Sequence, residues 1–235
     1  MEKNITFKWV FFLLFVLFLP SLACDYSKMN RYNPEDLTAD DLSGLDLSYH
    51  SLANVDFSGK NLQNVDFTQS ILSNSDFSGA DLTGAVFDYA DLRRANFTDA
   101  ILDQKWARII DLLTTGDGAG KDFSTYDLSK TYLFGVNLSN ANLQDADLVD
   151  TILTGADLSN ADLSGANLQQ ADLERANLHN TVLTNADLEM VDLSVTDLTS
   201  TIVTERQLRS AKFLCTRMPD GSVRNKESYC TPPPP

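Results

Sequence analysis

The stretch ANLQDADLVDTILTGADLSNADLSGANLQQADLERANLHN, residues 141–180, places a leucine at every fifth position. Ala or Thr lies two residues before each leucine, and Asp or Asn usually lies between them. A period of five fits neither an α-helix, with about 3.6 residues per turn, nor a simple strand, with a period of about two. The stretch therefore predicts a repeat architecture, in which each short unit buries its apolar residue only by stacking on neighbouring units.

The five-residue register continues on both sides of this stretch, in two tracts that we place at residues 55–102 and 123–204. In the first tract the central residue alternates between Phe and Leu, whereas in the second it is always Leu from Leu128 to Leu198. The two tracts are therefore expected to differ in the content of their cores.

The motif A-[D/N]-L-x-x, repeated at this density over residues 37–213, resembles the pentapeptide repeat family. The resemblance implies an all-β solenoid, a right-handed quadrilateral parallel β-helix with four pentapeptides in each coil. Residues twenty apart would then stack on one face, about 4.8 Å from each other. The resemblance implies architecture only, because one fold can host many unrelated functions.

Stacking at this spacing makes a specific prediction about the aromatic residues of the first tract. Phe57, Phe77 and Phe97 should form one column of rings, and Phe67 and Phe87 should form the opposite column. The distance between coils suits offset stacking of the rings.

The position two residues before each central residue also points inward in this family and must be small. Before Val55 it carries large residues, among them Leu45 and His50. We therefore expect residues 24–54 to form an N-terminal cap with irregular first repeats, and regular coils to begin near Val55.

The register breaks between the tracts, because Leu102 and Phe123 are 21 residues apart. Within residues 103–122, apolar side chains recur at i, i+3, i+4 and i+7, which is typical of an amphipathic helix. These side chains are Trp106, Ile109, Ile110 and Leu113. Asp103 is suited to cap the start of the helix and Gly116 its end.

A helical interruption followed by a Gly-rich loop is similar to interruptions in cyanobacterial-type members of the family. The insertion is either a lid on the side of the solenoid or a protrusion that docks a partner, with Trp106 as its contact. Its Gly-rich loop does not match a phosphate-binding loop, which needs Gly at Thr115, Ser or Thr at Asp122, and a following helix. No cofactor is therefore expected.

Residues 1–23 are typical of a signal peptide: Lys3 and Lys8 precede an unbroken apolar run that ends before a small-x-small cleavage site. The run is too short to span a bilayer, which needs about 20 residues. Cleavage after Ala23 would leave Cys24 at the N-terminus, which resembles a bacterial lipoprotein. Ordinary signal-peptidase cleavage and lipidation of Cys24 both fit this segment.

Residues 205–235 resemble the C-terminal cap and tail of exported pentapeptide repeat proteins. Such a cap is needed because the open end of a coil stack is an unpaired sheet edge. Cys215 and Cys230 flank a Pro-Asp-Gly turn in this segment. In an oxidising compartment the two are expected to pair, and closing that loop would contribute about 3 kcal/mol. A Pro-rich tail follows.

The composition is acidic, with 33 Asp and Glu against 18 Lys and Arg and a net charge of -15. Nucleic-acid binding needs clustered Lys and Arg, so it is not expected. The charge favours solubility or a basic partner. The Asp-rich columns, such as Asp127, Asp147, Asn167 and Asp187, contain Asn that relieves repulsion without a metal, so no metal site is expected.

Catalysis is not expected either, because neither of the two histidines stands in a constellation of nucleophile and base. The predicted function is that of an exported structural or protein-interaction scaffold in the periplasm, thylakoid lumen or extracellular space. The alternative is an acidic DNA mimic that inhibits or protects a topoisomerase, which would require a cytosolic protein.

A contact surface is suggested by apolar residues at outward positions that elsewhere carry Asp or Asn. Val182 and Ile202 are twenty residues apart and should stack on one face near the C-terminal end. Such an exposed pair needs cover. Either the C-terminal tail folds over it, or it contacts a protein partner or a second subunit, which leaves monomer and weak dimer open. Membrane contact is expected only through a lipid at Cys24.

Overall fold

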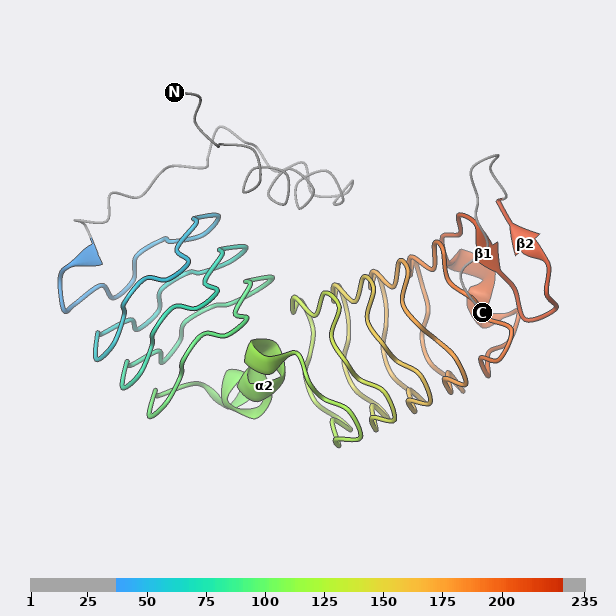
Figure 1. The fold of residues 1–235 in the computed structure, drawn as a ribbon, viewed down its shortest axis with the longest axis horizontal. Helices are drawn as coiled ribbons and strands as arrows, with labels where there is room; N and C mark the ends of the chain where they lie inside the picture. Colours follow the sequence, from blue (N-terminus) through green and yellow to red (C-terminus); the bar gives the residue numbers. More distant parts are fainter. Residues whose placement is uncertain (1–36, 226–235) are drawn as a thin grey trace, which may run out of the picture. The chain divides into compact units, whose positions relative to one another are not determined.

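Each five-residue repeat forms one side of a coil in the computed structural model, which describes residues 37–225 (Figure 1). The central residue is buried, and the residue two places after it has a positive φ, such as 60° at Asn140 and 68° at Gly155. The Asp or Asn of the motif closes the corner: Asp157 Oδ1 accepts the N–H of Ser159 at 3.0 Å. This is an Asx turn, so the polar residue of the motif has a structural role.

Parallel bridges join residues that are twenty apart, so four repeats make one coil, as predicted. Backbone hydrogen bonds connect successive coils; the Leu158 N–H, for example, donates to the Asn177 carbonyl oxygen at 2.9 Å. The described chain is therefore a β-helix solenoid in two stacks of coils. The bridges run from Asp41↔Asn61 to Asp81↔Ile101 and from Asp117↔Asn137 to Asp197↔Arg217.

Phenylalanine rings fill the core of the first stack in the two predicted columns. Phe57 and Phe77 have centroids 5.0 Å apart and planes 11° apart, and Phe77 and Phe97 follow at 4.8 Å and 12°. Phe67 and Phe87 stack at 5.2 Å and 7°. The two columns meet edge to face at 5.7 to 6.2 Å. Both preferred geometries of aromatic pairs thus recur at every coil.

Leucine fills the core of the second stack, and the inward position two residues earlier is mostly Ala or Thr. The buried threonines have partners: Thr151 Oγ1 donates to the Leu128 carbonyl oxygen at 2.8 Å, and Thr181 Oγ1 to that of Leu158 at 2.8 Å. A buried hydroxyl without a partner would be destabilising. Thr151 and Thr181 therefore tie their coils to the coil before, whereas Thr131 and Thr196 donate to the carbonyl oxygen three residues earlier in their own coil.

The parallel ladder begins at Asp41, earlier than the expected start near Val55. The large inward residues fit because this coil has no other coil before it among the described residues. Leu45 and His50 are consequently only half-buried, whereas the side chains at the same position deeper in the stack are enclosed. The central residues of the first coil are already buried: Leu42, Leu47, Leu52 and Phe57.

The predicted helical insertion is present as α2, Gln104–Thr115 (Figure 1). Gly116 ends it in the left-handed conformation at φ 69°, and its N–H donates to the Leu112 carbonyl oxygen at 2.9 Å. Asp103 stands at the N-cap position but makes no side-chain cap bond. Its Oδ2 instead accepts the N–H of Gly84 at 3.0 Å, so the predicted capping role is wrong because the adjacent coil engages the carboxylate.

The Gly-rich segment after α2 is the first repeat of the second stack rather than a loop, since Asp117 already bridges Asn137. Gly118 takes the central position, and its N–H donates to the Asn137 carbonyl oxygen at 2.7 Å. A Cβ there would lie 2.8 Å from Leu138 Cδ2 and 2.9 Å from Leu112 Cδ1. The absent side chain thus makes room for Leu112 of α2, which the sequence pattern did not indicate.

The coil ladder also continues beyond residue 204, the predicted end of the second tract. A 3₁₀ turn, η3 (Gln207–Ser210), interrupts it, and the bridges Asp192↔Lys212 and Asp197↔Arg217 resume it.

A short antiparallel hairpin follows η3. Strand β1 (Thr216–Arg217) pairs with β2 (Val223–Arg224), with Thr216 opposite Arg224. Met218 fills the central core position beside β1 and is 1% exposed. Strand β1 is therefore part of the last coil, because Arg217 bridges Asp197, and β2 pairs with it from beyond that coil.

Several predicted features lie outside the described residues: the signal peptide 1–23, Cys24, Cys230 and the Pro-rich tail. Within residues 37–225, none of the helices has the length and apolar character needed to cross a membrane.

Candidate interaction surfaces

Trp106 lies in the core between the two stacks rather than on the surface. It is 5% exposed, and its ring meets Phe87 edge to face with centroids 5.5 Å apart. Lys105 Nζ lies 4.9 Å from the centroid of the indole ring. The predicted docking role of Trp106 is therefore not supported, because the apolar face of α2 is used to close the Phe core.

The two stacks are joined through their backbones as well as through α2. The Tyr89 N–H donates directly to the Lys130 carbonyl oxygen at 2.7 Å, whereas the Arg94 N–H donates to the carbonyl oxygen of Thr114 in α2 at 2.8 Å. Lys130 Nζ also lies 3.7 Å from Asp88 Oδ2. Backbone bonding between Tyr89 and Lys130 continues the ladder across the insertion at this side of the coil.

A buried carboxylate beside this junction is neutralised by a bidentate ion pair. Arg93 Nε and Nη2 donate to Asp91 Oδ1 and Oδ2, both at 2.7 Å, and the Asp91 side chain is 7% exposed. The hydrogen bond to Asp91 raises the pKa of Arg93. The guanidinium carbon lies 5.6 Å from the Tyr132 ring centroid, and burial raises the pKa of Tyr132 to about 12. These groups hold the junction and are poorly suited to proton transfer near neutral pH.

The corner carboxylates of the repeats are likewise engaged in structure. The hydroxyl and N–H of Ser78 lower the pKa of Asp76, and the side chains of Thr83 and Gln63 lower that of Asp81. As predicted, one column stacks Asp127, Asp147, Asn167 and Asp187. Among residues 37–225 no three His, Cys, Asp or Glu side chains are grouped so that they could hold a metal ion.

Large apolar side chains are exposed mainly near α2 and at the C-terminal end. Val86, Ile101 and Phe134 belong to the coils on either side of α2, and Met190, Ile202 and Val223 to the last coils. Val182 and Ile202 bridge each other, which confirms that they stack. Ile202 remains 57% exposed among the described residues.

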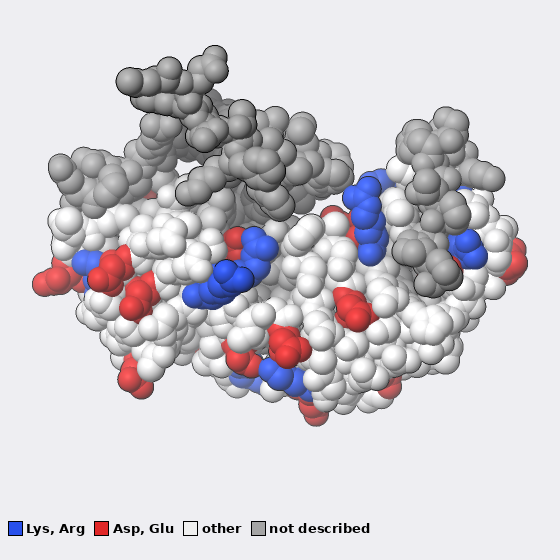
Figure 2. Space-filling model, in the orientation of Figure 1, with Lys and Arg blue, Asp and Glu red and all other residues white. Residues whose placement is uncertain are grey.

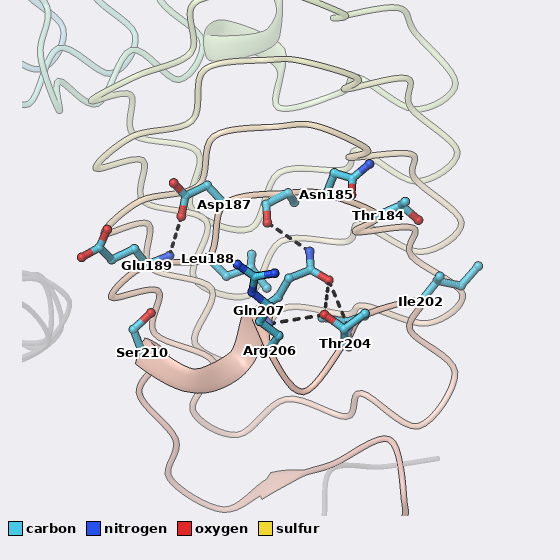
Figure 3. Close-up of a pocket in the computed structure, with 12 residues that line it drawn as sticks. Thr184, Asn185, Asp187, Leu188, Glu189, Ile202, Thr204, Arg206, Gln207 and Ser210 are labelled. Atoms are coloured by element: carbon cyan, nitrogen blue, oxygen red, sulfur yellow. Dashed lines mark hydrogen bonds between the residues drawn. The ribbon is translucent and has the colours of Figure 1, made fainter.

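Ile202 borders a groove of about 660 Å³ at the C-terminal end (Figure 3). One wall is the coil segment 184–189, and the other is 202–210, which includes η3. Figure 3 shows Arg206 and Gln207 on the η3 side of the groove, and Asp187 and Glu189 on the preceding coil.

The groove forms where η3 interrupts the ladder between two coils. The Leu183 N–H still donates to the Ile202 carbonyl oxygen at 2.9 Å. Beyond this point, the N–H groups of Asn185, Leu188 and Met190 donate to no backbone carbonyl within the described chain. These three N–H groups form a donor edge without backbone partners in the described chain; Asn185 and Leu188 line the groove, and Met190 directly follows its wall.

The acceptors of the same edge are satisfied by a side chain. Gln207 Nε2 donates to the carbonyl oxygens of Leu183 at 2.6 Å and Ala186 at 3.0 Å. In the regular coils an Ala carbonyl at this position accepts a backbone N–H, as Ala166 does from Asp187 at 2.9 Å. The edge therefore offers hydrogen-bond donors but no free acceptor at Ala186.

Cys215 is buried and disulfide-bonded. The sequence has only two other cysteines, Cys24 and Cys230, and both lie outside the described residues. Pairing with Cys230 therefore stays a prediction. Cys215 adopts the left-handed corner conformation, φ 56°, and its N–H donates to the Asn225 carbonyl oxygen at 3.3 Å.

Charge is distributed unevenly along the chain. In the visible face, Figure 2 shows acidic side chains spread singly and basic ones gathered in a few places. Residues 131–205 contain twelve acidic residues and one basic residue, Arg175. The acidic residues are Asp145, Asp147, Asp150, Asp157, Asp162, Asp172, Glu174, Asp187, Glu189, Asp192, Asp197 and Glu205.

Solved structures similar to the chain include several pentapeptide repeat proteins. A trypsin-treated form of QnrB1, a plasmid-mediated fluoroquinolone resistance protein, is 20% identical over 75% of this chain and 82% of its own, with a TM-score of 0.39. HetL, involved in heterocyst differentiation regulation in the cyanobacterium Nostoc sp. strain PCC 7120, is 27% identical over 78% and 87%, with a TM-score of 0.24.

A pentapeptide repeat protein from the thylakoid lumen of Arabidopsis thaliana is 21% identical over 77% of this chain and 81% of its own, with a TM-score of 0.23. The fold of this chain is defined by its own ladder of parallel bridges. No curated protein sequence matches the chain.

The pentapeptide repeat family matches the chain in eight copies, over residues 61–99, 131–170 and 161–199. These segments lie within the two stacks, on the repeats whose central residues are buried. The chain belongs to the pentapeptide repeat family.

Proposed function

We propose that this protein is an exported, non-enzymatic scaffold whose acidic second stack docks a basic protein partner. The observation that carries the proposal is the composition of residues 131–205, where Arg175 is the only basic residue among twelve acidic ones. Lys212, Arg217 and Arg224 from the following segment pair with three of these acidic residues, Asp192, Asp197 and Glu205. The remaining excess of negative charge attracts a partner of the opposite charge and raises the rate of encounter. The resemblance to the family further implies a right-handed solenoid.

The engagement of the described polar groups supports a scaffold rather than an enzyme. The corner carboxylates hold backbone N–H groups, and the Asp91 carboxylate is paired with Arg93. His50 Nδ1 lies 2.6 Å from the Ser48 carbonyl oxygen, in a coil far along the chain from His179. His179 Nδ1 does lie 2.9 Å from the exposed Ser200 Oγ. No carboxylate within residues 37–225 bonds to the His179 ring to orient it, so this pair is not a complete catalytic triad.

Export is tested by protease accessibility in a Gram-negative host that expresses the full chain. In spheroplasts, added protease should digest the protein while a cytosolic marker survives. A Leu14→Arg variant, which interrupts the apolar run of the signal segment, should remain protected until the cells are lysed. Protection of the unmodified chain in intact spheroplasts would refute export.

Docking on the second stack is tested by photo-crosslinking at two equivalent exposed positions, each two residues after a central residue and with a positive φ. A photoreactive residue in place of exposed Asp145 should capture a basic protein, and added salt should weaken the capture. The same residue at exposed Asp99, a corner of the first stack, should capture much less. Equal capture at both positions, or capture that salt does not affect, would contradict an acidic docking surface.

The acidic stack also favours a second candidate, a DNA mimic that acts on a topoisomerase. The assay is DNA supercoiling by gyrase in the presence of purified residues 24–235. Under the scaffold proposal, supercoiling is unchanged at micromolar protein. Inhibition or protection of gyrase, together with a cytosolic location, would establish the alternative instead.

A further inference from the structure

The groove beside η3 has a hydrogen-bonding character that restricts what can fill it. Its donor edge presents the N–H groups of Asn185, Leu188 and Met190, while Gln207 occupies the neighbouring acceptors. An extended segment added to a sheet edge normally both donates and accepts. Here a segment that only accepts would satisfy the edge without bringing unpaired donors of its own.

Proline is the residue with this property, because it has a carbonyl oxygen but no backbone N–H. Consecutive prolines are also held in an extended conformation before they bind, which lowers the entropy lost on docking. The exposed side chain of Ile202 borders the groove and offers an apolar contact to proline rings. The groove thus fits a proline-rich extended segment better than an ordinary strand.

The chain itself contains such a segment, Thr231-Pro-Pro-Pro-Pro235, outside the described residues. We propose that this segment, residues 231–235, binds in the groove of its own chain. Its carbonyl oxygens accept from the Leu188 and Met190 N–H groups, and its rings cover Ile202. The inference does not depend on docking on the acidic stack, but its disulfide tether needs an oxidising compartment and so rests on the proposed export.

The position of Cys215 explains why the segment from the same chain is favoured over one from a second copy. Cys215 is disulfide-bonded, and the predicted partner Cys230 directly precedes the segment. Ser210, which lines the groove, lies five residues before Cys215, so the two are at most about 17 Å apart. Five residues in the polyproline conformation extend about 15 Å. A tether of this length gives a high effective concentration at the groove.

The test is amide hydrogen exchange of oxidised protein, with chain 24–235 compared with a truncated chain 24–230. The amides of Leu188 and Met190 should exchange at least about tenfold faster after truncation. Those of Leu168 and Gln170, which donate to the carbonyl oxygens of Asp187 and Glu189 at 2.9 Å, serve as internal controls and should not change. Equal rates for Leu188 and Met190 in the two chains would overturn the proposal.

Matched variants distinguish specific docking from a general effect of the tail. Replacing the four prolines with alanine keeps the length of the segment but restores N–H groups, and should lose most of the protection. Ile202→Asp should lose it as well, whereas Ile101→Asp, at the same repeat position and 56% exposed, should retain it. Loss of protection in Ile101→Asp, or none in Ile202→Asp, would refute the assigned contact.

Protein concentration and the disulfide test whether the segment acts within its own chain. Protection in the full chain should be the same from 10 µM to 500 µM, and Cys230→Ser should reduce it. Protection that rises with concentration would place the segment in the groove of a second copy and overturn the proposal. Unchanged protection in Cys230→Ser would refute the tether.

Discussion

The residue two places after the central residue, here called the corner residue, adopts a positive φ in most repeats, which the central residue need not do. Most corners in the left-handed region are Gly, Asn or another polar residue, but Val195 adopts φ 60° and Thr125 adopts φ 61°. For a β-branched residue this region costs about 1–2 kcal/mol. The ladder enforces it at Val195, because the N–H there donates to the Leu214 carbonyl oxygen at 2.7 Å.

Relieving this strain should stabilise the protein. We expect Val195→Asn to raise the free energy of unfolding by about 1 kcal/mol, because Asn tolerates the left-handed region far better. Asn140→Val, the reverse exchange at an exposed corner of φ 60°, should lower it by a similar amount. Chemical denaturation measures both. Two changes of the same sign would show that backbone strain does not govern the corners.

The aspartates that directly precede the central residues, such as Asp162, predict how stability depends on pH. Burial raises the pKa of Asp162, but hydrogen bonds from Ser164 and Gln144 outweigh it, so the folded-state pKa is lowered. A lowered pKa contributes stability above the unfolded value of about 3.9, and this contribution is lost as the pH falls through the folded value. Asp162→Asn should therefore be less stable than the wild type at pH 7, and the difference should shrink as the pH falls below about 4.

Denaturation curves at a series of pH values measure this difference. Asn can still accept the Ser164 N–H, as Asn167 does from Gln169 at 3.2 Å, so the fold should persist. A difference that grows on acidification would show that the carboxylate is not favoured by its fold environment.

At the scale of single residues, the sequence predicted what repeats and missed what occurs once. Leu and Phe recur every five residues, so periodicity identified their core role. The motif Asp recurs as well, but its Asx turn with the N–H two residues later was found only in the structure. Gly118 stands at a central position but has no side chain, because Leu138, Phe123 and Leu112 of α2 occupy that space. Such a contact between an element and a coil cannot be derived from the period of either.

Among the elements, α2 shows how an insertion can be built into a repeat core. The helix buries Trp106 against Phe87 and directs Leu112 into the space above Gly118. The apolar spacing predicted the helix and three residues of its buried face, Trp106, Ile109 and Leu113. The fourth predicted residue, Ile110, is only half-buried, and Leu112 is buried instead. The apolar spacing did not predict that this face would close the core instead of lying on the side of the solenoid, because spacing gives no information on what a face contacts.

A double-mutant cycle tests the fit between α2 and the first repeat after it. Gly118→Ala should cost about 1–3 kcal/mol by overpacking, and Leu112→Ala about 2–5 kcal/mol by leaving a cavity. Because the added methyl group and the removed side chain share one space, the double variant should cost clearly less than the sum. Additive costs in thermal or chemical unfolding would mean that the two residues do not compete for that space.

For the whole molecule, stability should be local along the chain, because each coil contacts only its neighbours. Leu158→Asp places an unpaired charge among stacked leucines of the second stack and should unfold that stack. The Phe columns of the first stack make their own core. We therefore expect hydrogen exchange to show lost protection over 131–199 and retained protection over 61–86. Equal loss in both segments would show that the junction makes the chain one cooperative unit.

The repeat made the fold of the whole molecule predictable, but not its surfaces. The groove depends on η3, where the ladder departs from the pattern, and on the unpaired N–H groups of Leu188 and Met190. Sequence indicated Val182 and Ile202 only as apolar exceptions among polar positions. The donors could not be found in this way, since every residue has a backbone N–H and only its neighbours decide whether that N–H is paired.

The twenty-residue bridge offset also determines how such a gene can change in length. Residues 138 and 158 occupy equivalent places in successive coils. A deletion of residues 138–157 would therefore keep the repeat register and shorten the stack by one coil. A deletion of ten residues would instead turn every later side chain to the opposite wall. Insertions and deletions in this lineage should therefore survive mainly in steps of whole coils, and the outer walls can diverge while the length varies.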